Sequence, residues 1–575
     1  MMSTTEDELL ITDMRCALPT DAWSDAEAHI HRRRSEPPPA GKWRIIDYVS
    51  QRFSGSCLQT VHPDAATLTI PLRRKGWHAV SIGLAHPWMR RTFVEVRLTG
   101  EQDWQVIEGY RPGLDEPMPL YEPSGGSLLH EEPWIFADLT GKDLEVRYPV
   151  DYPQGVRVGV GRGSFYSVRA TPVRPEDLPT VTSRRHAYMV QALESSSRYP
   201  DDPRWINDQW DVVCSNNNCL NHPLTLKALH STFPHEPWEQ EPYYAESYRN
   251  DLAGPLEAGR DLVKETIATV HEHGKRFWFA MRPQAWGTAG VLDQATFTPF
   301  FAEHPEYRCV EADGGALSKL SVAFPEVRAY LNKHFKEWLQ RGADGISVIL
   351  VRGYPLVRYE EPIAELFRQR YGQDVRTIPD HEARLRAVWA EVVTEWFREL
   401  RQLCDEAGPT ELSPRRQLSV YSGPSLEWNW QFGFDVATWA REGLVDVIMP
   451  YPTGAHHTVQ LYGEYYDRPQ GWIDMPAYRE ALQGTGVEIV PSLGSCIDHL
   501  IPLAVYRERA HRHYSEGATG LCRWDNGADA ALARARLDDP GLQALWVERY
   551  MVKQQNWITE LQGMDVTRFA PGLAY

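Results

Sequence analysis

The chain has 575 residues, of which 42% are hydrophobic and 24% are charged, which indicates a globular protein with more than one domain. Its formal net charge of −18 argues against nucleic acid and anionic membranes as partners, because both bind basic surfaces. A run of about 18 apolar residues, as a transmembrane helix needs, does not occur.

Residues 1–40 form the predicted amino-terminal lead-in. Its first ten residues are acidic and lack the basic and apolar regions of a signal peptide. The 8 cysteines of the chain are scattered and include no CxxC pair. We therefore expect reduced thiols and a cytoplasmic location.

Residues 41–173 carry short, alternating or β-rich runs separated by turn residues. The clearest runs are Ala66–Leu72, Trp77–Gly83, Thr92–Leu98, Leu144–Tyr148 and Val156–Val160. Strands spaced in this way predict an antiparallel β-sandwich domain. The segment Arg174–Thr180, with two prolines, is the predicted linker out of that domain.

Residues 183–575 change to an alternation of apolar strand runs and helix patterns. The eight expected strands are Tyr188–Leu193, Trp210–Cys214, Arg276–Ala280, Gly345–Val351, Gln417–Tyr421, Val445–Met449, Val487–Pro491 and Gly520–Trp524. The helix patterns include Asp261–His273, Glu382–Ala407, Val436–Glu442 and Leu503–Glu516. This count predicts a (β/α)8 TIM barrel. An open doubly wound sheet is the alternative, but no Gly-x-Gly-x-x-Gly opens a helix after a strand.

The stretch from Pro325 to Pro362 is the clearest α/β unit. Its helix has apolar residues on one face, and Gly342 suits a left-handed cap at the end of that helix. Asp344 precedes the strand that follows, so we expect it to have a structural role. The loop after the strand contains Arg352, Glu360 and Glu361, and chemistry gathers at the carboxyl ends of such strands.

Polar and aromatic side chains follow each of the eight strands and would meet at one face of the barrel. They are Glu194; Asn216, Asn217, Asn218 and His222; Arg282, Gln284 and Trp286; Arg352, Tyr359, Glu360 and Glu361; Glu427, Trp428 and Trp430; Tyr451, His456 and His457; Asp498 and His499; Trp524, Asp525 and Asn526. This mixture suits a carbohydrate, because rings stack on sugar C–H faces while carboxylates cleave the acetal. We expect no metal and no cofactor: the first strand lacks the His-x-His of metal-dependent amidohydrolases, and adjacent histidines rarely face one ion.

Four segments of this region resemble the glycoside hydrolase-like family 10 barrels, over roughly residues 185–530. They are Phe300–Tyr307, Ser321–Leu331, Gly342–Ile346 and Asp435–Tyr451. The resemblance implies a TIM barrel and hydrolysis of glycosidic bonds. The family pattern has acidic residues late in the fourth strand, whereas this chain has Ser347-Val-Ile-Leu-Val-Arg352. Its nearest carboxylates follow later, at Glu360 and Glu361.

The site hypothesis assigns Glu361 as general acid, Asp525 as nucleophile or base, and Glu427 as the reserve carboxylate. The predicted substrate-binding residues are Arg282, Arg352, Glu360, Trp430, Tyr451, His456 and Trp524. Two alternatives remain open: a carbohydrate-binding protein without activity, and a lyase or isomerase acting on an acidic sugar. The sugar, the linkage, the stereochemical outcome and a homo-oligomeric state are left open as well.

Overall fold

The computed structural model describes most of the chain in separate segments. They are residues 8–25, 41–60, 62–86, 93–108, 128–149, 163–194, 206, 208–217, 258–260, 262–283, 299–351, 354–452, 472–494, 503–523, 534–553 and 556–565. The chain forms two compact units. The first unit comprises Met1–His186, Asp498–Arg512 and Ala528–Tyr575, and the second comprises Ala187–Ile497 and His513–Gly527.

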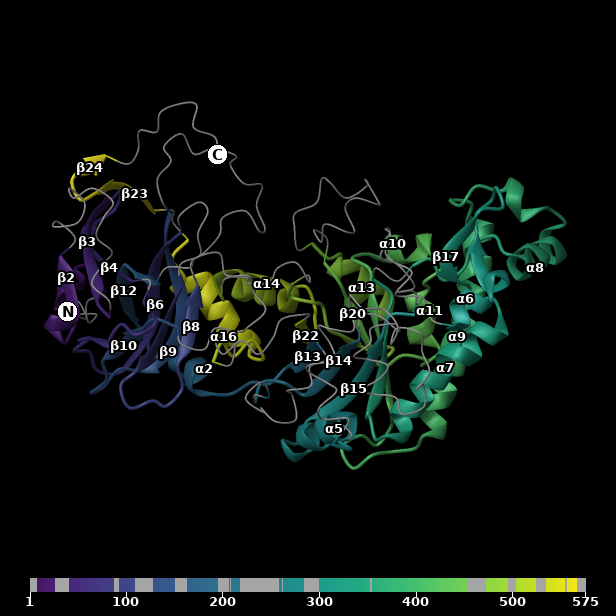
Figure 1. The fold of residues 1–575 in the computed structure, drawn as a ribbon, viewed down its shortest axis with the longest axis horizontal. Helices are drawn as coiled ribbons and strands as arrows, with labels where there is room; N and C mark the ends of the chain where they lie inside the picture. The colour runs from purple at the N-terminus through teal and green to yellow at the C-terminus, as the bar shows by residue number, and fades with distance from the viewer. Residues whose placement is uncertain are drawn as a thin grey trace. The chain divides into compact units, whose positions relative to one another are not determined.

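The first unit contains a ten-stranded sheet and a four-stranded sheet (Figure 1). The larger sheet has the order β1-β12-β6-β9-β23-β3-β4-β11, with β2 beside β3 and β24 beside β23. Its strands are β1 (Leu9–Ile11), β2 (Trp23–Asp25), β3 (Trp43–Ser50), β4 (Ser54–Thr60), β6 (Trp77–His86), β9 (Leu128–Asp138), β11 (Gly163–Phe165), β12 (Ser167–Pro172), β23 (Asn556–Leu561) and β24 (Met564–Asp565). The smaller sheet, β5-β10-β7-β8, consists of β5 (Leu68–Ile70), β7 (Phe93–Leu98), β8 (Gln105–Glu108) and β10 (Leu144–Arg147).

Both sheets of the first unit contribute to one hydrophobic core. Alternate residues such as Val80 and Ile82 on β6 and Val94 and Val96 on β7 are fully buried in it, as expected for strands with one face toward a core. All named strand pairs in this unit are antiparallel except β2 with β3. The predicted antiparallel strands within residues 66–148 are therefore confirmed, while the run Val156–Val160 lies outside the described residues.

Three segments of the first unit differ from the sequence-based expectation. Residues 8–25 of the expected lead-in form β1 and β2 with two 3-10 turns, η1 (Met14–Cys16) and η2 (Thr20–Ala22). These strands are only three residues long, too short for alternation to reveal them. The expected linker leads into helix α2 (Leu178–Thr182). Near the carboxyl terminus, β23 pairs with β9 and β3, so this segment joins the ten-stranded sheet.

Apart from α2, the described helices of the first unit come from the carboxyl-terminal third of the chain. They are the amino-terminal part of α14 (Leu503–Ser515), then α16 (Pro540–Leu545) and the π-helical turn η9 (Trp546–Tyr550). Arg507 of α14 is almost fully buried and donates to Pro133 O, Trp134 O, Ala535 O and Gln543 Oε1 at 2.8–3.0 Å. These four bonds connect α14, β9 and the segment around α16.

The second unit is built on an eight-stranded parallel sheet in the order β21-β20-β19-β18-β15-β14-β13-β22. Its strands are β13 (Tyr188–Glu194), β14 (Val212–Asn217), β15 (Arg276–Met281), β18 (Gly345–Ile349), β19 (Gln417–Ser422), β20 (Val447–Pro450), β21 (Glu488–Ile489) and β22 (Gly520–Arg523). The last strand pairs with the first, and a parallel bridge joins Ser492, just after β21, to Cys522 of β22. The sheet is thus a nearly closed barrel, and all eight strands predicted from the sequence are confirmed.

In the described parts of the connections between the barrel strands, the chain forms helices and one hairpin. The helices are α5 (Leu262–Glu272), α6 (Pro299–Glu303), α7 (Pro325–Gln340), α8 (Glu361–Tyr371), α9 (Ala383–Glu406), α10 (Leu426–Gln431), α11 (Val436–Arg441) and α13 (Met475–Leu482), with short turns η6 (Pro305–Tyr307) and η7 (Val375–Thr377). The hairpin consists of β16 (Arg308–Val310) and β17 (Ala316–Leu320) and lies between β15 and α7. As predicted, Gly342 follows α7 with a positive φ of 109°.

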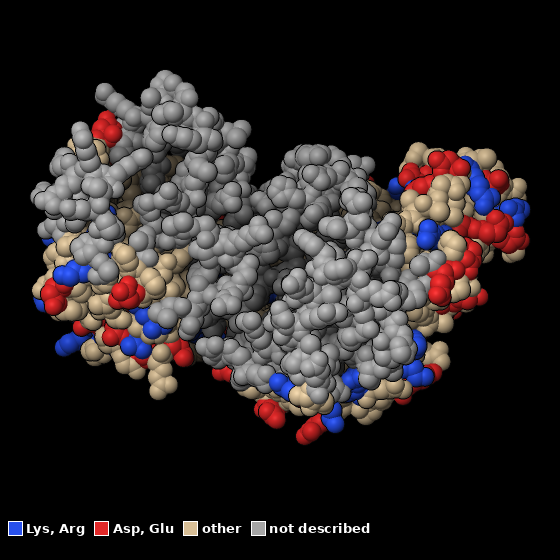
Figure 2. Space-filling model, viewed as in Figure 1, with Lys and Arg blue, Asp and Glu red and all other residues tan. Residues whose placement is uncertain are grey.

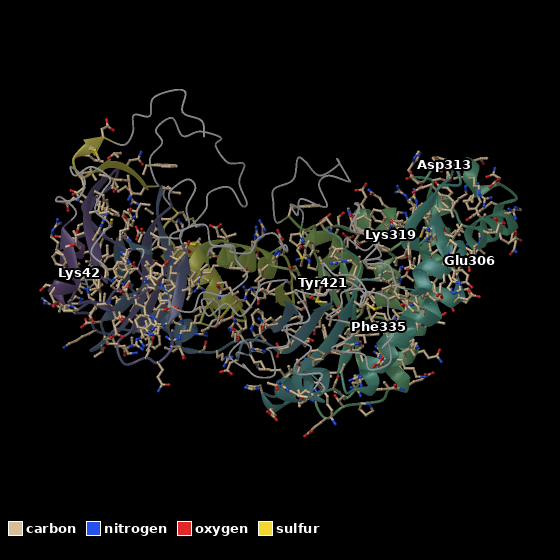
Figure 3. All side chains as sticks on the ribbon, viewed as in Figure 1. Lys42, Glu306, Asp313, Lys319, Phe335 and Tyr421 are labelled. Carbon is tan, nitrogen blue, oxygen red and sulfur yellow. The ribbon has the colours of Figure 1, made fainter. Side chains whose placement is uncertain are left out.

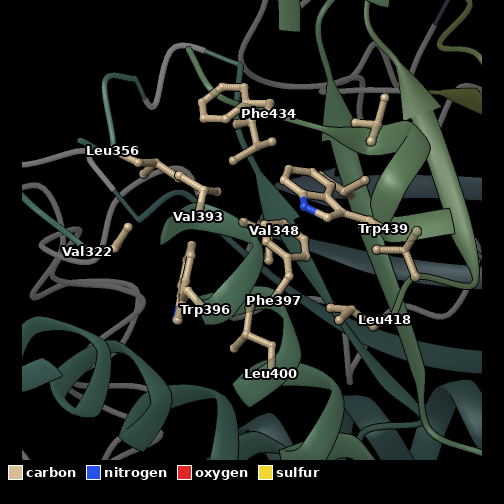
Figure 4. Close-up of a cluster of buried hydrophobic side chains, with 14 of the residues drawn as sticks. Val322, Val348, Leu356, Val393, Trp396, Phe397, Leu400, Leu418, Phe434 and Trp439 are labelled. Carbon is tan, nitrogen blue, oxygen red and sulfur yellow. The ribbon is translucent and has the colours of Figure 1, made fainter. Parts of the chain in front are cut away.

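Two hydrophobic layers hold the second unit together. Residues such as Cys214, Trp278, Tyr421 and Met449 fill the barrel interior. Outward-facing strand residues pack against the helices, as Figure 4 shows for Val348 and Leu418 beside aromatic residues of α9 and α11. In that layer the rings of Phe397 and Trp439 stack with their centroids 3.8 Å apart.

Asp344 has the structural role that its place before β18 predicts. It is fully buried and accepts hydrogen bonds from His271 Nε2 at 2.7 Å, from the Phe277 amide at 2.8 Å and from the Thr410 hydroxyl. Burial alone would raise the pKa of this carboxyl, but these hydrogen bonds outweigh it and the pKa is lowered.

Among the described helices, none combines the length and the apolar character that crossing a membrane requires.

Candidate active site at the carboxyl ends of the barrel strands

The barrel interior contains two cysteine thiols close to the Tyr421 phenol, but neither thiol is suited to act as a nucleophile. The hydroxyl of Tyr421 lies 3.3 Å from Cys522 Sγ (Figure 3 labels Tyr421). Burial raises the pKa of Cys522 to about 12 and that of Cys214 well above its usual range. Both thiols are therefore protonated at neutral pH, and a thiolate mechanism needs the opposite shift. None of the six described cysteines forms a disulfide with another described residue.

Two predicted substrate-binding residues lie where barrel strands end. Arg282 follows β15 directly, is only 4% exposed, and donates from Nε to the carbonyl of Val351 at 2.9 Å. The guanidinium is thereby fixed at the carboxyl ends of β15 and β18. Tyr451 follows β20, belongs to the interior cluster that includes Val351, and donates its amide to Ser422 O at 3.0 Å. Both side chains are thus held at the face of the barrel where βα loops carry chemistry.

The corner between β19 and α10 is fixed by a buried polar network. Tyr478 of α13 donates to the carbonyl of Gly423 at 2.7 Å, and Asn429 Nδ2 donates to the Tyr478 hydroxyl at 2.6 Å. The Ser422 hydroxyl lies 2.8 Å from the same oxygen, and Asn429 Oδ1 accepts from the Gly423 amide at 2.8 Å. Ser425 caps α10 by accepting from the Trp428 amide. The backbone that carries α10 is therefore tied to the end of β19.

Glycine is required at position 423 by close packing. A Cβ atom there would lie 1.8 Å from the ring of Trp428. Trp428 itself is buried and packs edge-on against Tyr354, with ring centroids 5.1 Å apart. The backbone at Gly423 and the indole ring of Trp428 thus lie closer together than any larger residue would allow.

The three predicted residues on α10 have different surroundings. Trp428 belongs to the outer hydrophobic layer, Trp430 is half-buried, and the Glu427 side chain is exposed in the first turn. No hydrogen bond or ion pair to another described residue involves the Glu427 carboxylate. This carboxylate therefore stands in solvent at the carboxyl end of β19, on a helix that the network around Tyr478 holds in place.

Glu360 and Glu361 are adjacent in sequence but differ in environment. Glu360 is 2% exposed and accepts hydrogen bonds from Ser321, from the Arg358 amide and from the Val310 amide. Burial raises its pKa despite these bonds. The side chain of Glu361 is 65% exposed and forms ion pairs with Arg376 at 3.0 Å and Arg368 at 3.7 Å.

Helix α8, which begins with Glu361, packs against α9 and η7 and lies far from β13 and β22 in Figure 1. On this part of the surface, acidic and basic side chains are interspersed in Figure 2. The Glu361 carboxylate is exposed and already forms ion pairs with two arginines, whereas the carboxyl that acts as general acid in a glycosidase commonly lies in an apolar pocket. The geometry therefore favours Glu427 over Glu361 as an available carboxylate.

Four predicted site residues, Arg352, His456, Trp524 and Asp525, lie outside the described residues. The backbone of β13 and β14 is described to their ends, where Glu194 and Asn216 are partners in register. Within the described segments, no three His, Cys, Asp or Glu side chains form a group that could hold a metal ion. The network of Ser422, Asn429 and Tyr478 was not predicted, because its members are up to 56 residues apart and nothing in their local spacing indicates contact.

Comparisons with known proteins give no family for this chain. No family model matches the sequence, and no curated protein matches it. Among solved structures, it is similar to the α-galactosidase of Thermus thermophilus (12% identity, 88% of this chain and 92% of the other, TM-score 0.33). It is also similar to a ruminal GH26 endo-β-1,4-mannanase (9% identity, 96% of this chain and 98% of the other, TM-score 0.26). A third similar structure is the glycoside hydrolase domain of PelA from Pseudomonas aeruginosa (13% identity, 60% of this chain and 98% of the other, TM-score 0.31). With TM-scores this low, these similarities identify no activity.

Proposed function

We propose that this protein is a glycoside hydrolase that cleaves a glycosidic bond at the carboxyl ends of the barrel strands. The observation that carries the proposal is the exposed Glu427 carboxylate, held on α10 at the end of β19 in a parallel barrel. Residues at this face perform the chemistry in barrel enzymes. The half-buried Trp430 on the same helix and the Arg282 guanidinium offer the ring and the charged donor that sugar binding uses.

The proposed reaction uses Glu427 and Asp525, which follow the fifth and eighth strands of the barrel. One carboxyl gives its proton to the leaving glycosidic oxygen, so that the bond from this oxygen to the anomeric carbon breaks. The other carboxylate either takes a proton from the attacking water or first bonds to the anomeric carbon, depending on their separation. Water supplies the new hydroxyl group in both cases. The remaining sugar-binding residues in this proposal are Arg352, Tyr451, His456 and Trp524.

Kinetics of carboxylate variants test the assignment of Glu427. Wild-type protein is first screened on aryl glycosides and oligosaccharides, and the best substrate is used for the variants. Glu427→Gln should lower kcat by at least about 100-fold, the scale of general acid–base catalysis. Glu361→Gln and the control Glu365→Gln, both on the exposed surface of α8, should stay within about threefold of the wild type. A large loss in Glu361→Gln alone would instead assign the acid to α8.

A lyase or isomerase acting on an acidic sugar is the second candidate, and Arg282 is the observation that favours it. A buried guanidinium at the mouth of a barrel suits recognition of a sugar carboxylate by paired hydrogen bonds. An unsaturated or isomerised product in the screen would support this candidate. Binding of oligosaccharides without any product would indicate a carbohydrate-binding protein on the same barrel.

A further inference from the structure

The buried carboxylate of Glu360 joins segments that are separate in the sequence. Both of its oxygens accept from the Arg358 amide at 3.0 Å, and the Ser321 hydroxyl donates to Oε1. The Val310 amide donates to Oε2 at 3.4 Å. Val310 belongs to β16 and Ser321 follows β17, whereas Arg358 lies in the segment after β18. One side chain therefore holds the β16–β17 hairpin and the 354–360 segment together.

Backbone hydrogen bonds near Glu360 also join the β16–β17 hairpin and the residues after it to the 354–360 segment. The Tyr359 amide donates to Val310 O, and the Val322 amide donates to Leu356 O, both at 2.9 Å. In addition, Arg358 forms an ion pair with Glu311 at 2.7 Å. The hairpin follows β15 and the 354–360 segment follows β18, so both belong to the face of the barrel where strands end. In Figure 3 the hairpin extends outward from Lys319 toward Asp313.

The 354–360 segment also contacts α10, the helix that carries Glu427. The ring of Tyr354 stacks on Phe432 with centroids 4.5 Å apart and meets Trp428 edge-on at 5.1 Å. At its other end, Trp389 of α9 donates from Nε1 to Arg358 O at 2.7 Å. Any shift of the segment would therefore change the packing beneath α10.

We propose that Glu360 is a positioning residue that fixes the hairpin and the 354–360 segment against α10, without touching substrate. A role in orienting Glu427 rests on the proposed function, whereas the structural connection does not. Full burial excludes the substrate contact predicted from the sequence for the Glu360 side chain in this conformation. Replacement by Ala leaves the Ser321 hydroxyl and the amides of Val310 and Arg358 without their acceptor. Replacement by Gln keeps one acceptor oxygen of the same reach.

Hydrogen exchange by mass spectrometry on the full-length protein, without substrate, tests the connection. Glu360→Ala should speed exchange in residues 308–322 and 354–360 at least about tenfold and leave the strands β13, β14 and β15 unchanged. Glu360→Gln should show a clearly smaller effect. The control Glu365→Ala removes an exposed carboxylate of α8 and should leave both segments at wild-type rates. Unchanged exchange in Glu360→Ala, or faster exchange spread evenly over the barrel, would overturn the proposal.

Kinetics separate this inference from the proposed function. On a substrate that the wild type hydrolyses, Glu360→Ala should lower kcat about tenfold with KM within about threefold, because a small displacement of a catalytic group affects mainly the chemical step. Glu360→Gln should restore most of kcat. An increase in KM alone would contradict positioning and indicate substrate contact. If the wild type hydrolyses no glycoside, the proposed function fails, and hydrogen exchange still decides the role of Glu360.

Discussion

Removing the Tyr478 hydroxyl should destabilise the β19–α10 corner more than removing an ordinary buried hydroxyl. In the structure this oxygen donates to Gly423 O and accepts from Asn429 Nδ2 and the Ser422 hydroxyl. Asn429 Nδ2 also donates to Ser425 O at 2.9 Å, so it keeps one partner in Tyr478→Phe. The Ser422 hydroxyl and the Gly423 carbonyl lose theirs.

The expected cost follows from these two buried groups. An unsatisfied buried polar group costs about 1–3 kcal/mol, so Tyr478→Phe should lower the free energy of unfolding by roughly 2–4 kcal/mol. Tyr359→Phe is the matched control, because its hydroxyl makes one bond of 3.2 Å to the Ile378 carbonyl. Losing that single bond should cost only about 0.5–1.5 kcal/mol.

Urea titration read by hydrogen exchange measures both costs within the second unit, with peptides from β19, α10 and α13 for Tyr478→Phe and peptides covering residues 354–378 for Tyr359→Phe. Resolving the peptides matters because a protein of two units need not unfold in one transition. We expect Tyr478→Phe to lose more unfolding free energy than Tyr359→Phe, with the loss concentrated in α10. Equal losses in the two variants would refute the view that the network around Tyr478 fixes this corner.

Two further predictions concern buried charged groups. Asp344→Asn should lower the free energy of unfolding by about 1–3 kcal/mol at neutral pH, because hydrogen bonds of the carboxylate are lost. The difference in melting temperature between this variant and the wild type should shrink in acid. The pKa of Asp344 is lowered below 3.8 by folding, so its contribution is present above that pH and is lost as the pH falls through the lowered value; a constant difference down to acid pH would contradict this. Arg507→Met should destabilise the first unit by roughly 3–5 kcal/mol, because four buried acceptors lose a charged donor. Wild-type exchange in β9 and α16 peptides of this variant would show that the bonds contribute little.

The parts of the fold that sequence predicts well are those with a local signal. All eight barrel strands are short apolar runs between turn residues, and α7 has its buried residues on one face with Gly342 after it. Strand β23 is different, because its partners β9 and β3 lie more than 400 residues earlier. Nothing in a six-residue run specifies so distant a partner, so its place in the first unit could not be predicted.

The candidate site shows the same limit at the level of single residues. Glu360 and Glu361 are neighbours in the sequence, yet one is buried beneath the β16–β17 hairpin and the other is exposed. Likewise, Trp428 is buried while Trp430 is half-buried. Sequence predicts that carboxylates and aromatic residues follow the strands, but which of them face solvent depends on contacts made by distant loops. The choice of Glu427 therefore needs the structure.

Hydrolysis in water enriched in oxygen-18 tests the central claim most directly. The best substrate of the glycoside panel is incubated with the protein, and the products are analysed by mass spectrometry. A glycoside hydrolase places one oxygen from water on the anomeric carbon, so the released sugar should gain about 2 mass units in the wild type. The rate of this labelling should fall at least about 100-fold in Glu427→Gln. An unlabelled, unsaturated product would contradict hydrolysis, as would the absence of any cleavage across the panel.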